Sequence, residues 1–291
     1  MTQKFIIGTR ASRLALWQAE EVARQLRALG VNAELKKITT KGDVIQDRSL
    51  AEIGGKGLFL KELEDELLSG NIRIAVHSLK DVPFELPERL VIGAILPRGE
   101  ARDAFVGRDG KNISDLAPGA VIGTASLRRL VQVQKKFPQL KFHTLRGNVE
   151  TRLKKLDDGE FDGIILAWAG LERLGLIHRI THGLEIVSAV GQGAIGIECR
   201  DNDLEALELI KALHDPLTGQ CVTLEREFLR RVSGNCQTPL GCHVIIDPKD
   251  KKCFLMRYFW SRPDGSDFTL GDVHGPWTDG PKIVQELSLP V

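Results

Sequence analysis

The chain lacks the features that mark membrane, disulfide-stabilised and nucleic-acid-binding proteins. No apolar run in its 291 residues approaches the roughly 20 residues of a membrane-spanning helix. Its five cysteines are odd in number and form no C-x-x-C pair, so we expect neither a disulfide framework nor a structural zinc site. Basic and acidic residues number 40 and 39 and aromatic residues make up 5%, which argues against a general nucleic-acid binder.

The first residues also lack the pattern of a secretory signal. Residues 1–8 hold one lysine and a short apolar run, without the long apolar stretch and small-residue cleavage site of a signal peptide. We therefore read them as a first strand and expect a cytoplasmic protein that neither enters a membrane nor binds nucleic acid.

What the chain does have is a regular alternation of strand and helix patterns. Apolar residues recur at helical spacing between residues 14 and 29, and Gly30 follows as a stop signal. After a polar break at residues 97–100 the rhythm restarts. Such alternation predicts βαβ units around largely parallel sheets. The predicted strands are 4–8, 33–38, 72–76, 120–123, 141–145, 163–167 and 194–199, and the predicted helices are 14–29, 58–68, 126–136, 149–156, 169–174 and one after Asp203.

From Pro216 the pattern changes to one helix, residues 217–232, and strand-like runs at 242–246, 254–260 and 268–273. The sequence therefore predicts an α/β protein with two α/β domains and a small α+β C-terminal domain. We place domain 1 at residues 1–97 and 194–215, domain 2 at 98–193 and domain 3 at 216–291.

Arginines gather at the junctions where predicted strands pass into helices. They lie in three segments, residues 8–12, 123–129 and 146–148. Ligands of open α/β sheets bind beyond the carboxyl ends of the strands, where free N–H groups at helix starts favour anions. Arginine adds forked, charge-assisted bonds to carboxylates. Three such junctions favour an anionic ligand, although arginine is also a common surface residue.

A glycine-rich segment, residues 54–57, offers no nucleotide-binding pattern. It lacks the spacing of a P-loop, and no G-x-G-x-x-G opens a helix. The glycines indicate either a mobile loop that brings Lys56 and Phe59 to the ligand or a turn at the entry of a helix.

Two further residues are candidates for chemistry. Asp81 follows Lys80 just past a buried strand, where it is either a proton donor and charge stabiliser or a turn-forming residue before Val82-Pro83. Cys236 lies in a Gly/Asn-containing loop, which favours an exposed thiol that acts as a nucleophile or attachment point. The other cysteines fit the ordinary role of small buried apolar residues.

Together these residues resemble a known family, the hydroxymethylbilane synthases or porphobilinogen deaminases. The resemblance extends from Gly8 to about Gly241. It rests on long motifs: GTRASRLALWQ, TKGD, GGKGLFLKELE, AVHSLKDVP, RDAFV, IGTASLRR, LRGNVETRL, ILAWAGLERLG, AVGQGAIGIECR and CQTPLG.

The resemblance implies a dipyrromethane cofactor joined by a thioether to Cys236. It implies that four porphobilinogen molecules are added in turn with loss of ammonia, and that water then releases hydroxymethylbilane for haem and other tetrapyrroles. Every pyrrole carries an acetate and a propionate, which accounts for the many arginines. It further implies a monomer with two domains like those of periplasmic binding proteins, the active site in the cleft between them, and a small third domain.

The family's roles carry over where its motifs match. Asp81 would stabilise the azafulvene cation that forms as ammonia leaves and would assist proton transfer. The remaining expected cofactor- and substrate-binding residues, with no metal among the ligands, are Arg10, Ser12, Lys56, Phe59, Ser78, Lys80, Thr124, Ser126, Arg128, Arg129, Arg146, Asn148, Arg152, Arg173 and Gln192.

The chain departs from the family at two positions. Asn235 replaces the second of two glycines before the cysteine, and asparagine tolerates left-handed backbone angles better than most residues. Trp168 stands where a small residue is common, so its ring either narrows the cleft or stacks on a pyrrole. A non-catalytic anion-binding protein is the alternative function, but it leaves the loop around Cys236 without a role.

Overall fold

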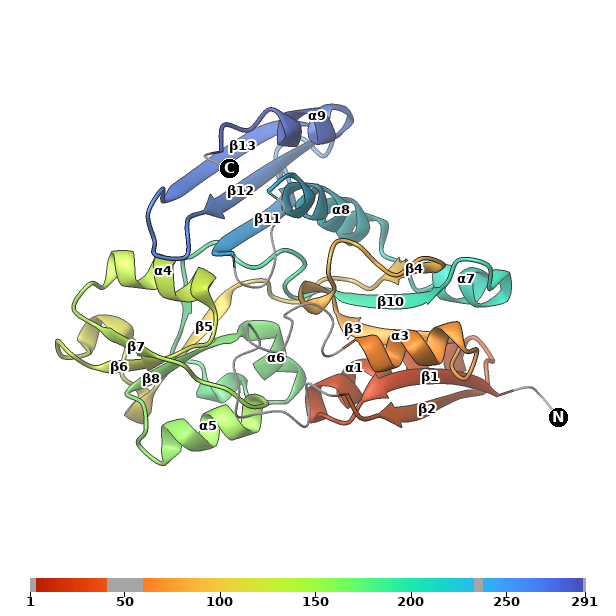
Figure 1. Cartoon of the computed structure of the whole chain (residues 1–291), viewed down its shortest axis with the longest axis horizontal. Coiled ribbons are helices and arrows are strands. Elements are labelled where there is room, and N and C mark those ends of the chain that lie inside the picture. Colours follow the sequence, from red (N-terminus) through yellow and green to blue (C-terminus); the bar gives the residue numbers. More distant parts are fainter. Residues whose placement is uncertain (1–3, 41–59, 233–237, 290–291) are drawn as a thin grey trace. The chain divides into compact units, whose positions relative to one another are not determined.

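The computed structural model describes residues 4–40, 60–232 and 238–289 (Figure 1). Two compact units make up the chain. Unit 1 comprises Met1–Gly99 and Ala194–Gln220, and unit 2 comprises Glu100–Gly193 and Cys221–Val291. The two units are described in turn.

Unit 1 is built on a five-stranded sheet with the order β2-β1-β3-β10-β4. Strands β1, β2 and β3 are parallel to one another, whereas β10 runs antiparallel to both of its neighbours. The strands are β1 (Phe5–Arg10), β2 (Ala33–Ile38), β3 (Ile74–Ser78), β4 (Leu90–Ile95) and β10 (Ile195–Arg200).

Helices cover both faces of this sheet because successive strand side chains point in opposite directions. On one face, Ile74 packs with residues of α1 (Arg13–Ala28) and α7 (Leu204–Lys211). On the other, Ala75 packs with Leu63 and Leu67 of α3 (Lys61–Leu68). The helical spacing of Leu14, Trp17, Val22, Leu26 and Leu29 predicts the buried face of α1 only in part: Val22 and Leu26 are buried, but Trp17 and Leu29 are 39% and 54% exposed. The rest of the buried face is Gln18, Ala19 and Ala23.

Unit 2 contains a second five-stranded sheet of the same design, with the order β7-β6-β8-β5-β9. Strands β6, β7 and β8 are parallel, and β5 is antiparallel to both of its neighbours. The strands are β5 (Asp103–Gly107), β6 (Val121–Gly123), β7 (Lys141–His143), β8 (Gly163–Ala167) and β9 (His182–Leu184).

The helices of unit 2 again lie on opposite faces of the sheet (Figure 1). Val133 of α4 (Leu127–Lys136) packs with Phe105 and Ile122. Leu153 and Leu156 of α5 (Val149–Asp157) pack with residues of β8 and of α6 (Trp168–Arg173) on the other side.

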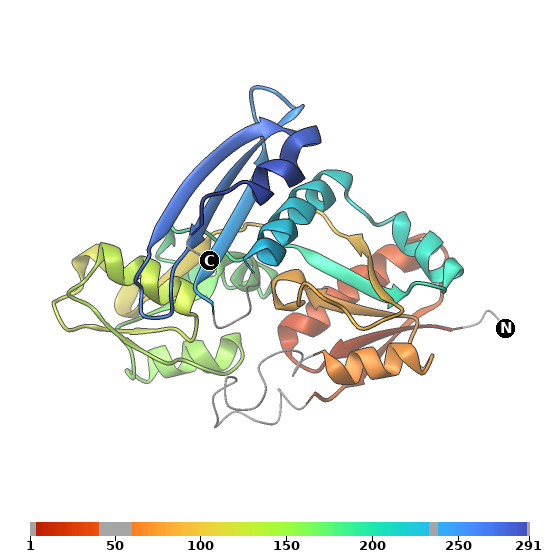
Figure 2. The same ribbon diagram turned by 45° about the horizontal axis from the view of Figure 1, so that its top comes forward.

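A three-stranded antiparallel sheet completes unit 2 (Figure 2). Phe228 of α8 (Pro216–Arg231) and Val284 of α9 (Gly280–Gln285) share one core with inward-facing residues of the sheet such as Phe254 and Met256. The strands are β11 (Leu240–Ile246), β12 (Cys253–Trp260) and β13 (Thr269–Pro276).

The predicted fold class, two α/β sheets with a small α+β part, is confirmed. The expectation of largely parallel sheets is only partly correct, because β10 and β5 each run against their neighbours. Strands β4, β5 and β9 were not anticipated, since β9 is three residues long and β5 begins with a charged residue. The boundaries of the three predicted domains stay a prediction.

Candidate active site

Five predicted site residues of unit 1 lie at one edge of its sheet. Strands β1 and β3 are parallel neighbours, with Ile7 opposite Ile74, so their carboxyl ends lie side by side. This edge is where an open α/β sheet binds ligands. The five residues are Arg10, Ser12, Ser78, Lys80 and Asp81.

Hydrogen bonds hold the two serines of this edge. Ser12 is the N-cap of α1, and its Oγ accepts a bond from the Ala15 amide at 3.3 Å. Gln18, 2% exposed on α1, donates from Nε2 to Ser78 Oγ at 2.8 Å. Asp81 ends a 3-10 turn (Leu79–Asp81) and is exposed. Sequence reasoning missed Gln18, whose signal is a polar residue on the apolar face of a helix.

A buried cluster of Glu64, His77 and Glu198 joins α3, β3 and β10, and β3 is the strand that leads to Asp81. His77 Nε2 is 2.9 Å from Glu198 Oε2, and both side chains are buried. Burial, and next the charge of Glu198, raise the pKa of Glu64 on α3 to about 7, against a smaller opposing effect of His77. Glu64 therefore titrates close to neutral pH.

Four predicted residues of unit 2 lie at the carboxyl ends of two neighbouring parallel strands, β6 and β7. Thr124 and Ser126 follow β6, Arg146 and Asn148 follow β7, and Arg173 ends the helix after β8. The sequence placed arginines at the junctions after β6 and β7, and the topology brings these two junctions to one edge of the sheet.

Two helices begin at this edge with side-chain caps. Ser126 Oγ accepts from the Arg129 amide at 3.4 Å, and Asn148 Oδ1 accepts from the Thr151 amide at 2.8 Å. Thr124, 4% exposed, accepts from the Ser126 amide at 3.2 Å. The caps satisfy some of the free N–H groups and leave a positive helix end that favours an anion.

Two half-buried predicted arginines of unit 2 bond to backbone carbonyls. Arg152 Nε donates to the carbonyl of Gly147 at 2.7 Å, and Gly147 has a φ of 110°. Arg173 Nη2 donates to the carbonyl of Gly193 at 2.5 Å. Burial lowers the pKa of Arg173 to about 10, so its guanidinium stays charged at neutral pH.

Three further predicted binding residues converge on one carboxylate that the sequence analysis did not assign. Arg128 donates from Nη1 to Asp103 Oδ2 at 2.7 Å and from Nη2 to Oδ1 at 3.2 Å. Arg129 Nε and Gln192 Nε2 donate to the same Oδ1 at 2.8 and 3.1 Å. All four side chains are buried. The arginines expected to hold ligand carboxylates therefore already hold a carboxylate of the chain.

The charge of Asp103 is fixed by this arrangement. Burial alone would raise the pKa of its carboxyl, but the charges of Arg128 and Arg129 hold that pKa well below its usual range. The two guanidiniums and one carboxylate thus carry a net charge of +1.

The predicted residues Lys56, Phe59 and Cys236, with Asn235 beside the last, lie outside the described residues. Of the four cysteines that the structure describes, Cys199, Cys221 and Cys242 are buried and Cys253 is intermediate. Burial raises the pKa of the Cys199 thiol to about 11, and burial together with Asp250 raises that of Cys253. A raised pKa is the opposite of what a reactive cysteine needs, and Cys221 and Cys242 are buried.

Trp168 stacks on a protein cation. Arg102 Cζ lies 4.9 Å from the centre of its ring, and the Trp168 amide donates to the Arg102 carbonyl at 3.1 Å. The ring also packs against a hydrophobic core of unit 2. It therefore has partners within its own unit.

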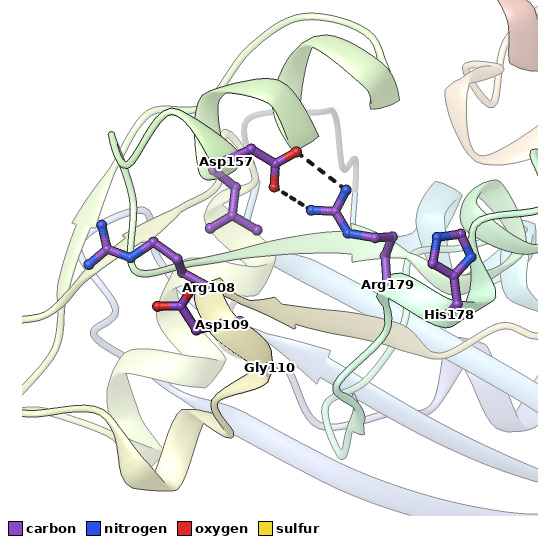
Figure 3. Close-up of a pocket in the computed structure, with 8 residues that line it drawn as sticks. Arg108, Asp109, Gly110, Asp157, His178 and Arg179 are labelled. Atoms are coloured by element: carbon purple, nitrogen blue, oxygen red, sulfur yellow. Dashed lines mark hydrogen bonds and ion pairs between the residues drawn. The ribbon is translucent and has the colours of Figure 1, made fainter.

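A hollow of about 370 Å³ in unit 2 contains none of the predicted residues (Figure 3). Arg179 Nη2 lies 2.5 Å from Asp157 Oδ1, and Arg108 Nη2 lies 2.6 Å from Asp162 Oδ1. Because both of its arginines are neutralised by neighbouring carboxylates, this hollow is a poor anion site. Its lining residues are Gly107, Arg108, Asp109, Gly110, Leu156, Asp157, His178 and Arg179.

No helix in the described parts of the chain has both the length and the apolar character needed to cross a membrane.

Comparisons with known proteins cover almost the whole chain. Residues 5–208 match the family model described as porphobilinogen deaminase, dipyromethane cofactor binding domain, and residues 219–289 match the one described as porphobilinogen deaminase, C-terminal domain. A porphobilinogen deaminase of Syntrophotalea carbinolica is 53% identical over 82% of this chain and 78% of its own. A porphobilinogen deaminase of Thiobacillus denitrificans is 46% identical over 97% of this chain and 93% of its own. The solved structure of the methionine binding protein MetQ aligns with a TM-score of 0.48 at 12% identity, over 77% of this chain and 94% of its own.

Proposed function

The chain belongs to the porphobilinogen deaminase family, and on that premise we propose how its own residues divide the work of the reaction. It is a transferase of tetrapyrrole biosynthesis with hydroxymethylbilane synthase activity, and it works with a dipyrromethane cofactor. Its substrate is porphobilinogen. In each of four additions a carbon–nitrogen bond breaks, ammonia leaves and a carbon–carbon bond forms, and water finally releases the product.

The residues of unit 2 fit a group that carries several carboxylates. The strand-to-helix junctions after β6 and β7 bring capped helix starts and arginines to one edge of the sheet. Arg128, Arg129 and Asp103 together keep a net charge of +1 there, which one ligand carboxylate would neutralise. When bound, the dipyrromethane supplies the carbon to which the first porphobilinogen is joined.

We assign the holding of acetate and propionate groups to the residues at the two sheet edges. Charged guanidiniums and ammonium groups would make charge-assisted hydrogen bonds, and the hydroxyl and amide groups would fix orientation. The assigned residues are Arg10, Ser12, Ser78, Lys80, Thr124, Ser126, Arg128, Arg129, Arg146, Asn148, Arg152, Arg173 and Gln192, with Lys56 and Phe59 outside the described residues.

Cys236 is the proposed attachment residue. The four described cysteines support this choice, because Cys199, Cys221 and Cys242 are buried and the thiol of Cys253 has a raised pKa. A thioether forms most readily at an accessible thiol that can ionise.

Asp81 is the proposed catalytic acid. It is exposed at the end of its 3-10 turn, at the sheet edge that also carries Lys80 and Ser78. A carboxylate there would stabilise the positive charge that develops on the substrate pyrrole as ammonia leaves, and would take up and return a proton.

We also propose that the enzyme acts as a cytoplasmic monomer with the three predicted domains. The resemblance to its family supports this state. Size-exclusion chromatography with light scattering should give the mass of one chain, and a mass of two chains would contradict the monomer.

The role of Asp81 is tested by Asp81→Asn, with Glu85→Gln, an exposed acid four residues further along, as the control. Asp81→Asn should fold and carry cofactor but lower kcat by about 100- to 10,000-fold, the usual contribution of general acid–base catalysis. Glu85→Gln should leave kcat unchanged. Near-normal turnover of Asp81→Asn, measured as ammonia release, would remove Asp81 from the mechanism.

A further inference from the structure

The motif RDAFV, residues 102–106, matches the family but has no role in the function described so far. Its residues 103–106 form the start of β5, and its aspartate, Asp103, is fully buried. A buried carboxylate is costly unless it is paired and hydrogen-bonded, so its partners indicate why it is there.

Those partners are three residues assigned to ligand binding, Arg128, Arg129 and Gln192. They come from α4 and from the segment before β10, and the antiparallel strand β5 brings Asp103 opposite Ala167 at the carboxyl end of β8. Asp103 thus lies at the sheet edge where the ligand is expected.

We propose that Asp103 is a positioning residue for the cofactor- and substrate-binding arginines. Arg128 and Arg129 are adjacent on α4, and their like charges would drive the guanidiniums apart. The shared carboxylate draws both to one point and fixes their rotamers before a ligand arrives. The trio of Arg128, Arg129 and Asp103 then has a net charge of +1, which attracts one further carboxylate.

The guanidinium planes are fixed by second contacts. Arg128 Nη1 also donates to the Val187 carbonyl at 2.6 Å, and Arg129 Nη1 donates to the Ile165 carbonyl at 3.0 Å. Gln192 Nε2 likewise reaches the Ala101 carbonyl at 2.6 Å. Each side chain is therefore held by Asp103 at one point and by a backbone carbonyl at another.

Unit 1 contains a comparable Arg–Asp–Arg contact that serves as a control, although Arg73 there also donates to Glu205 Oε2 at 3.0 Å. Asp203 Oδ2 accepts from Arg73 Nε and from Arg200 Nη2, both at 2.7 Å. Its side chain is 8% exposed, and it also caps α7 through the Ala206 amide at 3.1 Å. None of these residues is assigned to ligand binding, so loss of Asp203 reports the structural cost of breaking an Arg–Asp–Arg trio.

The test rests on the proposed function and uses Asp103→Asn, Asp103→Glu and Asp203→Asn in the full-length enzyme made in cells that supply porphobilinogen. In Asp103→Asn an amide N–H faces a guanidinium N–H and the trio rises to +2. We expect its ratio of cofactor-loaded to unloaded protein, measured by intact mass, to fall at least about tenfold. Its KM for porphobilinogen should rise about tenfold while kcat per loaded chain changes less than about threefold.

Asp203→Asn should lower Tm yet leave loading and KM within about twofold of the wild type, because its arginines bind no ligand. Asp103→Glu keeps the charge but moves it by one methylene, so its loading should lie between those of the wild type and Asp103→Asn. If Asp103→Asn does not fold, a raised KM in Asp103→Glu supports the proposal and an unchanged KM overturns it.

Two other results would overturn the proposal. One is wild-type loading and KM in Asp103→Asn. The other is equal loss of loading in Asp103→Asn and Asp203→Asn at equal loss of Tm, which would make Asp103 a structural residue only. Absence of cofactor from the wild type as well would instead refute the proposed attachment at Cys236.

Discussion

Replacing Glu64 with glutamine should change how the stability of the protein depends on pH. The Glu64 carboxyl is buried on α3 beside the paired His77 and Glu198, and its pKa is raised to about 7 from a usual 4.5. At about 1.4 kcal/mol per pKa unit, this rise in pKa corresponds to a loss of about 3 kcal/mol in the free energy of unfolding when the carboxyl ionises.

The sign follows from comparing the folded and unfolded chains. Below pH 4.5 the Glu64 carboxyl is protonated in both, so folding carries no ionisation cost. Between pH 4.5 and about 7 the unfolded chain has ionised while the folded chain keeps its proton, so the free energy of unfolding falls as pH rises. Above about pH 7 the folded chain bears the full cost of a buried charge next to Glu198.

The assay is urea unfolding followed by tryptophan fluorescence at pH values from 4.5 to 8. The free energy of unfolding of Glu64→Gln minus that of the wild type should increase by about 3 kcal/mol as pH rises from 4.5 to 8, because glutamine does not titrate. Glu88→Gln, at an exposed position outside α3, is the control and should differ from the wild type by a constant amount. A difference between Glu64→Gln and the wild type that does not change with pH would refute the reasoning.

Two further substitutions probe unit 2. Arg128→Leu removes the forked partner of buried Asp103, so we expect a loss of about 3–5 kcal/mol in unfolding free energy and weaker cofactor loading. If intact mass shows full cofactor loading in this variant, Arg128 is not needed to bind the cofactor. Gly147→Ala places a Cβ 2.7 Å from Thr151 Cγ2 at a φ of 110°. It should cost about 1–3 kcal/mol in urea unfolding and raise KM by moving the carbonyl that holds Arg152, whereas unchanged stability and KM would contradict this account.

Much of the fold could be predicted because local pattern and structure agree. The strand predicted at residues 33–38 matches β2, and that at 163–167 matches β8, since both are short apolar or alternating runs between turn signals. Ser126 caps α4 where the helix predicted for residues 126–136 begins. The buried face of α1 was less visible, because part of it consists of Gln18 and small alanines rather than large apolar residues.

The candidate site could be predicted in its location but not in its contacts. Arginines that follow neighbouring parallel strands must meet at one edge of the sheet, whatever the details of the loops. The inward turn of Arg128 and Arg129 depends on Asp103, which lies 25 residues before Arg128 on an antiparallel strand that was not anticipated. Such a contact depends on strand order, which periodicity along a single sequence does not encode.

The proposed mechanism requires a cofactor attached to the thiol of Cys236, and the intact mass of the purified protein tests this attachment. Protein made in cells that supply porphobilinogen should exceed the polypeptide mass by one dipyrromethane, and Cys236→Ser should have the bare polypeptide mass. A wild-type mass equal to the bare polypeptide, or an adduct that persists in Cys236→Ser, would contradict attachment at this residue.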